Sequence, residues 1–302
     1  MNIEEILKLI QCPNCVCGKL VSGEKKITCA DCQSIFSVVD GVPVLISKKE
    51  LSNQEKSQKK WFENHYAAFS DSEYNLEKWR QSMLNRVFEN EFKSQVKYYL
   101  DVGCGATGYT VIEGARRNGW ISFGTDISLE AMVRAKKLAT KEGVGDKTAF
   151  IVCSAENIPL KKGTFDYISS ISVLEHLEND WQAARELSRV LKEIGFIYVC
   201  VPNAYFRIWP FLWPFYYYKD RKIGHKRHYS VEKMDQMFTE KHSFRRHKLF
   251  YNGHLIKFIQ ILLEKLGRIS DKKWWQIEKR DISKNSSGVQ LNVIYSREKN
   301  IR

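Results

Sequence analysis

The segment 98–108 reads Tyr-Tyr-Leu-Asp-Val-Gly-Cys-Gly-Ala-Thr-Gly. An apolar run contains one acidic residue, Asp101, near its end, and three glycines follow within six positions. This pattern is typical of a buried parallel strand that stops at a tight turn where a helix begins. Glycine lets the backbone approach a ligand closely, and the first turn of the next helix offers free N–H groups. Loops, hairpins and dinucleotide-binding folds all form such turns, so this segment alone leaves the ligand open.

Predicted strands and helices alternate on both sides of this turn. Repeated strand–helix units of this length predict an α/β fold, doubly wound, with a parallel sheet covered by helices on both faces. Ligands of such folds bind at the carboxyl ends of the strands. The expected strands are 96–102, 120–126, 149–153, 165–173, 196–201, 244–251 and 289–295, and the expected helices in this region include 129–141 and 181–191, the latter stopped by Gly195.

An acidic residue, Asp126, ends the second predicted strand, 21 residues after Gly105. A carboxylate at this place can accept hydrogen bonds from both hydroxyls of a ribose, which predicts a cofactor that contains adenosine. The residues up to this point fit NAD and S-adenosylmethionine equally well.

The ends of the third and fourth strands separate these two cofactors. Residues 154–160 read Ser-Ala-Glu-Asn-Ile-Pro-Leu, residues 163–168 read Gly-Thr-Phe-Asp-Tyr-Ile, and residues 173–177 read Val-Leu-Glu-His-Leu. With the glycine turn and the segment 187–195, their order and spacing resemble the class I S-adenosylmethionine-dependent methyltransferases, of the type-11 kind that act on small molecules. The resemblance covers about residues 96–203. It implies a seven-stranded, Rossmann-like sheet and S-adenosylmethionine as cofactor.

The same resemblance implies which residues hold the cofactor. The glycine turn would hold its methionine end, Asp126 its ribose, the segment after the third strand its adenine, and the end of the fourth strand would lie beside the sulfonium. Two positions depart from the family pattern: its third glycine falls at Thr107, and an acid that meets the adenine amino group is replaced by Ser154, which weakens that contact or moves it to Glu156. The implied cofactor residues are Asp101, Gly103, Cys104, Gly105, Gly108, Asp126, Ile127, Ser154, Ala155, Glu156, Ser172 and Val173.

Glu175 and His176 are the candidate catalytic residues, since they follow the fourth strand beside the expected methyl donor. A neutral histidine can take a proton from a hydroxyl nucleophile near pH 7. The alternatives are a helix start with a surface histidine, or methyl transfer by alignment and proximity without a dedicated base.

The first 47 residues form a separate unit with two C-x-x-C motifs. Four thiolates from two such turns make the tetrahedral sulfur site that zinc prefers, and a site closed by four cysteines is structural. A segment this small lacks a core, so the metal would supply much of its folding energy. The predicted ligands are Cys12, Cys15, Cys29 and Cys32, with Cys17 as a spare thiol.

The segment after the second C-x-x-C motif contains an aromatic residue, Phe36, and an Asp-Gly-Val-Pro turn at 40–43. Together with the cysteines it resembles the Trm112-like zinc-ribbon domain, over about residues 5–47. That domain occurs alone as a methyltransferase partner and also fused in front of methyltransferases. The expected domains are therefore 1–47 (zinc ribbon), 48–95 (linker and helices) and 96–302 (methyltransferase).

Residues 48–95 divide by composition. The segment 47–60 has almost no apolar residues and is interpreted as a solvated linker or helix entry. Between residues 61 and 95 apolar residues recur at helical spacing, which predicts one or two amphipathic helices. Such helices pack on the core, and in the methyltransferase family they also cover the cofactor.

Two insertions near the sheet edge, at 204–229 and 253–287, are expected to determine the substrate specificity. The first ends in Gly-His-Lys-Arg-His-Tyr-Ser at 224–230, similar to a segment of many small-molecule methyltransferases, with Ser230 as a cap for a helix over 231–238. The second contains a stripe of apolar residues in 254–266, for which core packing and contact with a membrane surface are the two interpretations. The candidate substrate residues are His225, Arg227, His228 and Tyr229, with fixation of the loop as the alternative role of the histidines.

The formal net charge is +13, and residues 207–248 hold 11 Lys or Arg against four acidic residues. Basic and aromatic residues on the substrate side predict an anionic small-molecule or lipid-linked acceptor, methylated on oxygen or nitrogen. RNA is the first alternative, although the Asn-Pro-Pro-Tyr type motif of many amino-group methyltransferases is missing. A partner-binding module with secondary methylation is the second alternative.

The N-terminus is too short and too charged for a signal peptide, and no stretch can span a bilayer. A cytoplasmic protein is therefore expected, with contact to the inner face of the membrane as an option. The oligomeric state is left open.

Overall fold

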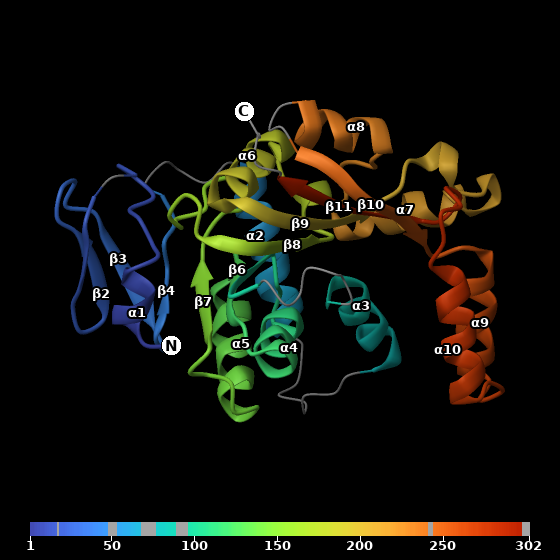
Figure 1. The fold of residues 1–302 in the computed structure, drawn as a ribbon, viewed down its shortest axis with the longest axis horizontal. Coiled ribbons are helices and arrows are strands. Elements are labelled where there is room, and N and C mark those ends of the chain that lie inside the picture. Colours follow the sequence, from blue (N-terminus) through green and yellow to red (C-terminus); the bar gives the residue numbers. More distant parts are fainter. Residues whose placement is uncertain (17, 48–52, 68–76, 89–95, 241–243, 298–302) are drawn as a thin grey trace.

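The computed structural model describes residues 1–16, 18–47, 53–67, 77–88, 96–240 and 244–297. Its centre is a seven-stranded sheet in the order β10-β11-β9-β8-β5-β6-β7 (Figure 1). β11 alone runs antiparallel to its neighbours. The strands are β5 (Tyr98–Val102), β6 (Ile121–Asp126), β7 (Thr148–Val152), β8 (Phe165–Ile171), β9 (Leu191–Pro202), β10 (Phe244–Asn252) and β11 (Gln290–Arg297).

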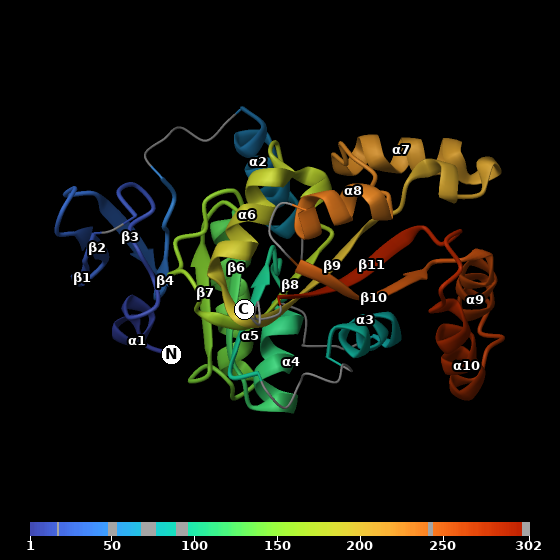
Figure 2. The same ribbon diagram turned by 45° about the horizontal axis from the view of Figure 1, so that its top comes forward.

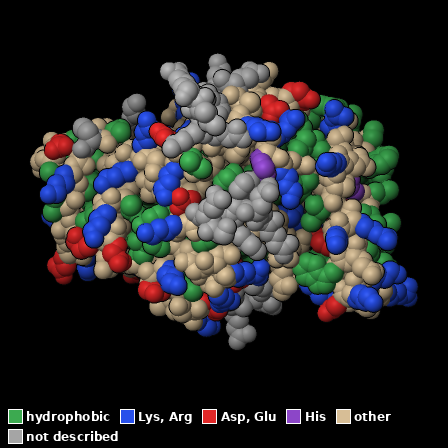
Figure 3. Space-filling view, viewed as in Figure 1, with side chains coloured by type: hydrophobic (Ala, Val, Ile, Leu, Met, Phe, Trp, Pro, Cys, Tyr) green, Lys and Arg blue, Asp and Glu red, His purple; other side chains and the backbone are tan. Residues whose placement is uncertain are grey.

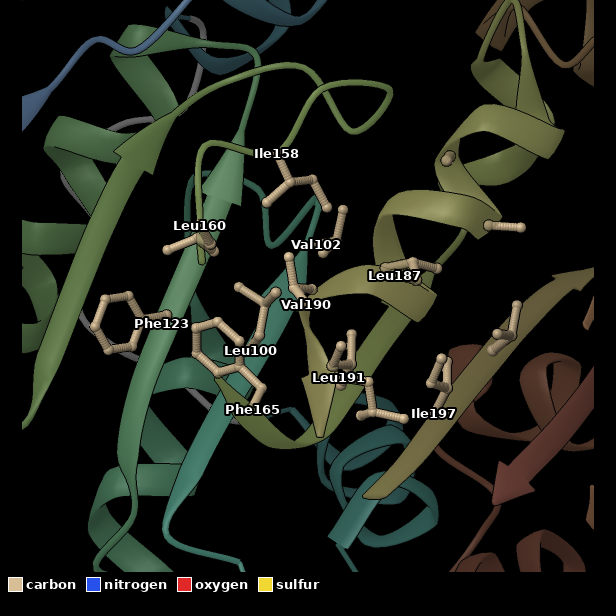
Figure 4. Close-up of a cluster of buried hydrophobic side chains, with 14 of the residues drawn as sticks. Leu100, Val102, Phe123, Ile158, Leu160, Phe165, Leu187, Val190, Leu191 and Ile197 are labelled. Carbon is tan, nitrogen blue, oxygen red and sulfur yellow. The ribbon is translucent and has the colours of Figure 1, made fainter. Parts of the chain in front are cut away.

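Helices cover both faces of this sheet, as predicted. α4 (Tyr109–Asn118) and α5 (Leu129–Lys141) pack on one face, and α6 (Asp180–Val190) packs on the other (Figure 1). Successive residues of β5 point to opposite faces: Leu100 joins the apolar cluster beneath α6, and Tyr99 joins the cluster on the α4 side. The close-up of the α6 side shows Leu187 and Val190 directed toward the side chains of β5, β6, β8 and β9 (Figure 4).

All seven predicted strands are present, but the end of α6 differs from the prediction. The helix was expected over 181–191 with Gly195 as its stop signal. It ends at Val190, one residue earlier, but the chain enters β9 directly at Leu191, so Gly195 is not what ends it. Leu191 pairs with Phe165 of β8 and is buried. Gly195 instead lies within the strand, where a Cβ would meet the carbonyl oxygen of Asp166 at 3.0 Å. The need to pair and bury Leu191 therefore overrides the glycine stop signal.

The N-terminal unit is small and packs on the edge strand β7. Val44 forms a parallel bridge with Val152, and the Leu45 N–H donates to the Val152 carbonyl at 2.8 Å. This pairing covers a sheet edge that would otherwise expose unpaired backbone groups. Ile10 and Leu160 form a second bridge, and both belong to the cluster beneath α6. The domain boundaries predicted at 47 and 95 stay predictions. The elements of this unit are α1 (Ile3–Leu7), β1 (Leu20–Ser22), β2 (Lys26–Cys29), β3 (Ile35–Val39) and β4 (Val42–Pro43).

Two helices lie in the region predicted as linker and amphipathic helices. α2 (Asn53–Ala67) begins inside the segment interpreted as a solvated linker and packs against α5. α3 (Lys78–Phe88) packs against α4 through buried Leu84, Val87 and Phe88. The remaining apolar residues of the predicted pattern between 68 and 76 and between 89 and 95 lie outside the described residues.

The two insertions lie together at the end of the molecule opposite the N-terminal unit (Figure 2). The first contains two short turns, Tyr205–Arg207 and Pro210–Leu212, followed by α7 (Trp213–Ile223) and α8 (Val231–Asp235), which Ser230 caps as predicted. The second contains α9 (Leu255–Lys265) and α10 (Asp271–Asp281). Among the described residues, no helix is both long and apolar enough to cross a membrane.

α9 is turned so that its polar side meets α10. Gln260 is buried and donates to the Trp274 carbonyl at 3.0 Å, and Lys257 pairs with Glu278. Its apolar stripe consequently faces outward, so the core-packing interpretation of this stripe is wrong. The exposed fractions are 43% for Leu255, 53% for Ile259, 59% for Leu262 and 54% for Leu266.

Candidate functional site

The glycine turn after β5 has the backbone conformation that only glycine adopts easily. Gly103 and Gly105 have φ values of +75° and +65°. A Cβ at Gly103 would also lie 2.3 Å from Cγ2 of Val173, which follows β8. The N–H groups of Gly103 and Cys104 donate to the Thr125 carbonyl at 2.7 and 3.0 Å, so the turn is tied to the end of β6.

Asp126 at the end of β6 is hydrogen-bonded to the glycine turn. Its Oδ2 accepts from the Gly105 N–H at 3.1 Å, and its Oδ1 accepts from the Ser128 N–H at 3.0 Å. Burial raises the pKa of this carboxyl to about 6, although these two bonds oppose the shift. Each carboxylate oxygen has a second lone pair, so Asp126 can still accept hydrogen bonds from a ligand.

A cavity of about 290 Å³ opens at the carboxyl ends of β5, β6, β7 and β8. This is where ligands of doubly wound folds bind. Of the residues predicted to hold the cofactor or to act in catalysis, those that line it are Gly103, Cys104, Gly105, Asp126, Ile127, Ser154, Ala155, Ser172, Val173 and His176.

Three residues of α2 complete this cavity, and the sequence interpretation missed two of them. Glu55 and Gln58 lie in the supposed linker, and Phe62 follows one turn later. The Ser154 hydroxyl donates to Oε1 of Glu55 at 2.6 Å. Their spacing, i, i+3 and i+7, places all three on one helix face. This spacing was the available signal, but the polar composition of the segment concealed it.

Three predicted cofactor residues do not line the cavity. Asp101 is buried beneath the turn, where it accepts from the hydroxyls of Thr110 and Ser169 and where burial raises the pKa of its carboxyl to about 7. Gly108 instead stands at the N-terminus of α4, with a φ of +52°. The carboxylate of Glu156 accepts from the N–H groups of residues 178 and 179 at 2.9 and 3.1 Å, so it fixes the start of α6 rather than facing the adenine region.

A second cavity, of about 390 Å³, adjoins the first and shares Phe62, Ser172 and His176 with it. The predicted substrate residues His225 and His228 line it. Arg227 and Tyr229 do not: the guanidinium of Arg227 donates to the carbonyls of residues 177 and 178, and Tyr229 is fully buried with its hydroxyl on Asp180. These two residues anchor the 224–230 segment and do not face the cavity, contrary to the prediction of substrate contact.

The histidines of the second cavity share one carboxylate. Oδ1 of Asp220 lies 2.8 Å from Nδ1 of His225, and Oδ2 lies 2.7 Å from Nε2 of His228. The Tyr205 hydroxyl also donates to Asp220. These bonds hold the pKa of the Asp220 carboxyl well below its usual range, despite partial burial.

Glu175 and His176 stand side by side on the short turn Leu174–His176 after β8, but they differ in environment. Glu175 is fully buried outside both cavity linings, and burial raises the pKa of its carboxyl to about 8. His176 faces both cavities, and burial together with nearby His225 lowers its pKa to about 4. His176 is therefore neutral at pH 7, as a base must be, although such a low pKa makes it a weak one.

The four predicted metal-binding thiols come together in the N-terminal unit. Their sulfur atoms all lie within 4.8 Å of one another, and the Cys12–Cys32 and Cys15–Cys29 pairs are each 3.6 Å apart. A tetrahedron with Zn–S bonds of ~2.3 Å has edges of about 3.8 Å, so the residues fit a zinc ion. Gly18 is a further requirement that the sequence interpretation did not identify, since a Cβ there would lie 2.1 Å from Sγ of Cys29.

Binding to the first cavity should depend on pH through Asp126. Only the ionised carboxylate accepts two hydrogen bonds from a ribose, so affinity for S-adenosylmethionine should rise with pH through about 6 and then level off. At pH 5 it should be about tenfold weaker than at pH 7. Calorimetric titration from pH 4.5 to 8 measures this.

Three other titratable groups face Asp126, namely Asp101, Cys104 and Cys153. The variant Asp126→Asn is therefore the control, because it should lack the step near pH 6 while keeping these three. An equal step in both proteins would assign the titration to Asp101.

Comparison with known proteins identifies the type of fold. Residues 100–199 match the family model described as "Methyltransferase domain". The crystal structure of a geranyl diphosphate C-methyltransferase from Streptomyces coelicolor A3(2) has a TM-score of 0.57 at 13% identity and covers 82% of this chain and 98% of that one. The [4+2]-cyclase SpnF has the same fold, with a TM-score of 0.56 at 18% identity, covering 81% of this chain and 96% of that one, so the fold alone does not set the reaction.

Two sequence relatives match part of the chain. Norajmaline N-methyltransferase of Rauvolfia serpentina is 36% identical over 94 residues, 31% of this chain and 32% of that protein. The 27-O-demethylrifamycin SV methyltransferase of Amycolatopsis mediterranei is 29% identical over 136 residues, 45% of this chain and 50% of that protein. The chain thus spans half or less of the length of these relatives.

The strand order, the glycine turn and Asp126 together define a class I S-adenosylmethionine-dependent methyltransferase fold. The predicted fold class is confirmed. Within this class, residues 100–199, about a third of the chain, match the model of the methyltransferase-domain family.

Proposed function

We propose that this protein transfers the methyl group of S-adenosylmethionine to a small or lipid-linked acceptor. The observation that carries the proposal is the pair of adjoining cavities, which meet at Ser172 and His176. The first cavity has the glycine turn and ribose acid of the methyltransferase class, and the second is lined by aromatic and histidine side chains. A donor in the first and an acceptor in the second would meet where the cavities join.

Each part of the first cavity would then have a defined task. Asp126 would hold the ribose, the turn at Gly103 and Gly105 the methionine end, and Ser154 and Ala155 the adenine. The cofactor supplies an electrophilic methyl group on a sulfonium. The aromatic ring of Phe62 on α2 would help exclude water from the junction, so that an acceptor oxygen or nitrogen is aligned with little competition.

The surface around the second cavity favours an amphipathic acceptor. Tyr216 of α7 lines the cavity, and the same segment exposes Phe206, Phe211 and Tyr217. Hydrophobic side chains gather at the end of the molecule where α7 and α9 lie (Figure 3). An exposed apolar surface of this kind marks an interaction site. Interleaved basic residues, which include Arg207, Arg221, Lys222, Lys265 and Arg268, would attract anionic headgroups.

We infer from this surface that the protein works at a membrane, at its cytoplasmic face, and takes an anionic, lipid-linked acceptor from it. Tryptophan and tyrosine, which this end exposes, are the residues that favour the level of the headgroups. RNA would be bound through stacking aromatics and basic residues as well, and the experiment below separates the two.

Labelling of an extract tests the proposed reaction. Purified protein and radiolabelled S-adenosylmethionine, added to fractionated extract, should place label in the lipid or small-molecule fraction. Label found only in RNA would support an RNA methyltransferase instead. If no fraction gains label although calorimetry shows cofactor binding, the zinc-ribbon binding module becomes the better interpretation.

Binding to vesicles tests the membrane contact. The double variant Ile259→Ser/Leu262→Ser should weaken binding to vesicles with anionic lipid at least tenfold, because each buried apolar side chain contributes about 1.5–3 kcal/mol. Ile194→Ser is the matched control, since Ile194 is 54% exposed but lies in β9 away from this end. Sedimentation with vesicles measures the partition. Equal binding of both variants would assign the contact elsewhere.

We also infer that the cysteine cluster holds a structural zinc ion. Its four thiols leave no ligand position open. Since Val44 and Leu45, which follow β4, pair with the edge of β7, the ion would stabilise the strand that leads into Ser154 and Ala155.

A further inference from the structure

Glu175, His176 and His225 form a compact cluster between the two cavities. The first two lie on the turn after β8, and His225 comes from the loop after α7, about fifty residues later in the chain. One ligand atom from each residue can be chosen so that all lie within 4.8 Å of one another. Nε2 of His225 is 3.7 Å from Oε1 of Glu175, and the two imidazole rings are 4.8 Å apart between centroids.

Glu175 is the unusual member of this cluster. Its side chain has no exposed surface, and neither carboxylate oxygen accepts a hydrogen bond of good geometry from the described residues. The Ser172 hydroxyl and the Glu175 N–H lie near enough to favour the charged form, but burial outweighs them and raises the pKa. A buried polar group of this kind is normally paired, because taking it out of water without a partner costs several kcal/mol. The described residues place no Lys or Arg side chain in an ion pair with it. A cation at this point would satisfy both oxygens.

His225 is held in the orientation that a metal ligand needs. Its Nδ1 lies 2.8 Å from Oδ1 of Asp220, whose other oxygen is held by His228 and Tyr205. A histidine that donates one ring N–H to a carboxylate leaves a lone pair on its other ring nitrogen. Histidines that bind metal ions commonly donate such a hydrogen bond to a carboxylate. The free end of the ring, Nε2, is the atom that faces Glu175.

We propose that Glu175, His176 and His225 bind one divalent transition-metal ion. Two imidazoles and one carboxylate favour Zn²⁺, Fe²⁺ or Mn²⁺ over Mg²⁺ and Ca²⁺, which prefer oxygen ligands. Three protein ligands leave a position open, as in catalytic metal sites. His176 and His225 both line the second cavity, so the open position faces the acceptor.

This arrangement narrows the acceptor to a compound with a hydroxyl or phenol group, a conclusion that rests on the proposed methyl transfer. A hydroxyl bound to the ion loses its proton to water at neutral pH far more easily than a free one. The oxygen then forms an O–C bond while the S–C bond of the sulfonium breaks, leaving a neutral thioether. The weak base His176 is not required to take the proton.

Counting of bound zinc tests the site without any turnover. Protein stripped with a chelator, reloaded with Zn²⁺ and freed of loose metal should hold two ions per chain, one at the cysteines and one here. Glu175→Gln, which keeps the shape of the side chain, should hold one, and so should His225→Gln. The control Glu193→Gln, an exposed carboxylate of β9, should still hold two, and Cys12→Ser/Cys29→Ser should hold the one at Glu175.

Two ions in Glu175→Gln and His225→Gln, or a single ion in the wild type that the cysteine variant loses, would overturn the proposal. Circular dichroism of each variant checks its fold. If Glu175→Gln and His225→Gln both lose one ion, misfolding of a single variant cannot explain the loss. Calorimetry with S-adenosylmethionine runs in parallel. If the wild type holds two ions but does not bind the cofactor, the proposed methyl transfer is refuted and the metal site remains supported. If it binds the cofactor normally but holds only one ion, the metal site is refuted and the proposed methyl transfer remains supported.

Discussion

We expect binding of S-adenosylmethionine to fall at least a hundredfold when Asp126 is replaced by alanine. The wild-type carboxylate would accept hydrogen bonds from both ribose hydroxyls, and bonds to a charged group contribute about 1.5–3 kcal/mol each. Asp126 also holds the N–H groups of Gly105 and Ser128, so its loss loosens the glycine turn at the same time. Calorimetric titration of the purified variant measures the effect.

Two further variants sharpen this result. Asp126→Asn keeps the shape but removes the charge, and we expect it to lose less affinity than the alanine variant. Asp146→Ala removes an exposed acid from the loop before β7 and should bind like the wild type. An unchanged affinity in Asp126→Ala would refute the assignment of the ribose to this residue.

We expect removal of the zinc ion proposed for the cysteine cluster to unfold the N-terminal unit. Structural zinc contributes on the order of 10 kcal/mol to the folding of small domains. The described strands of this unit have two to five residues each and could not remain folded without it. Hydrogen exchange of residues 11–46 should rise toward that of an unfolded chain after treatment with a chelator, while a chelator already saturated with zinc should have no effect.

Chelation should weaken the binding of S-adenosylmethionine to the first cavity without abolishing it. Loss of the pairing made by Val44 exposes the edge of β7, which leads into Ser154, whereas the glycine turn and Asp126 follow β5 and end β6. We expect the dissociation constant for S-adenosylmethionine to rise less than tenfold. Slow exchange that persists after chelation would show that no metal holds the cysteines together. Complete loss of cofactor binding would show that the N-terminal unit cannot be separated from the site.

The features that the sequence predicted correctly depend on local patterns. The strands and their ends follow from apolar runs that stop at glycine or an acid, and the parallel sheet places those ends at one edge. Asp126 and the four cysteines could be identified for this reason, because spacing along the chain is sufficient to bring them to their sites.

The misplaced residues were those whose role depends on the direction of a side chain. Asp101 points into the sheet beneath the turn and Glu156 points toward the start of α6, although both neighbour residues that line the cavity. Glu55 and Gln58 were missed because a polar segment becomes a helix only when it can pack, and α2 packs on α5.

The sequence by itself thus determined the class of fold, the acid at the end of β6 that lines the first cavity, and the four cysteines that come together in the N-terminal unit. Only the tertiary structure decided which way α9 faces, how α2 closes the cofactor cavity, and that Glu175 meets His225 from a loop about fifty residues away. The physical reason is that local patterns fix where strands and turns occur. The contacts between distant segments depend on which surfaces are left to be buried once the sheet has formed.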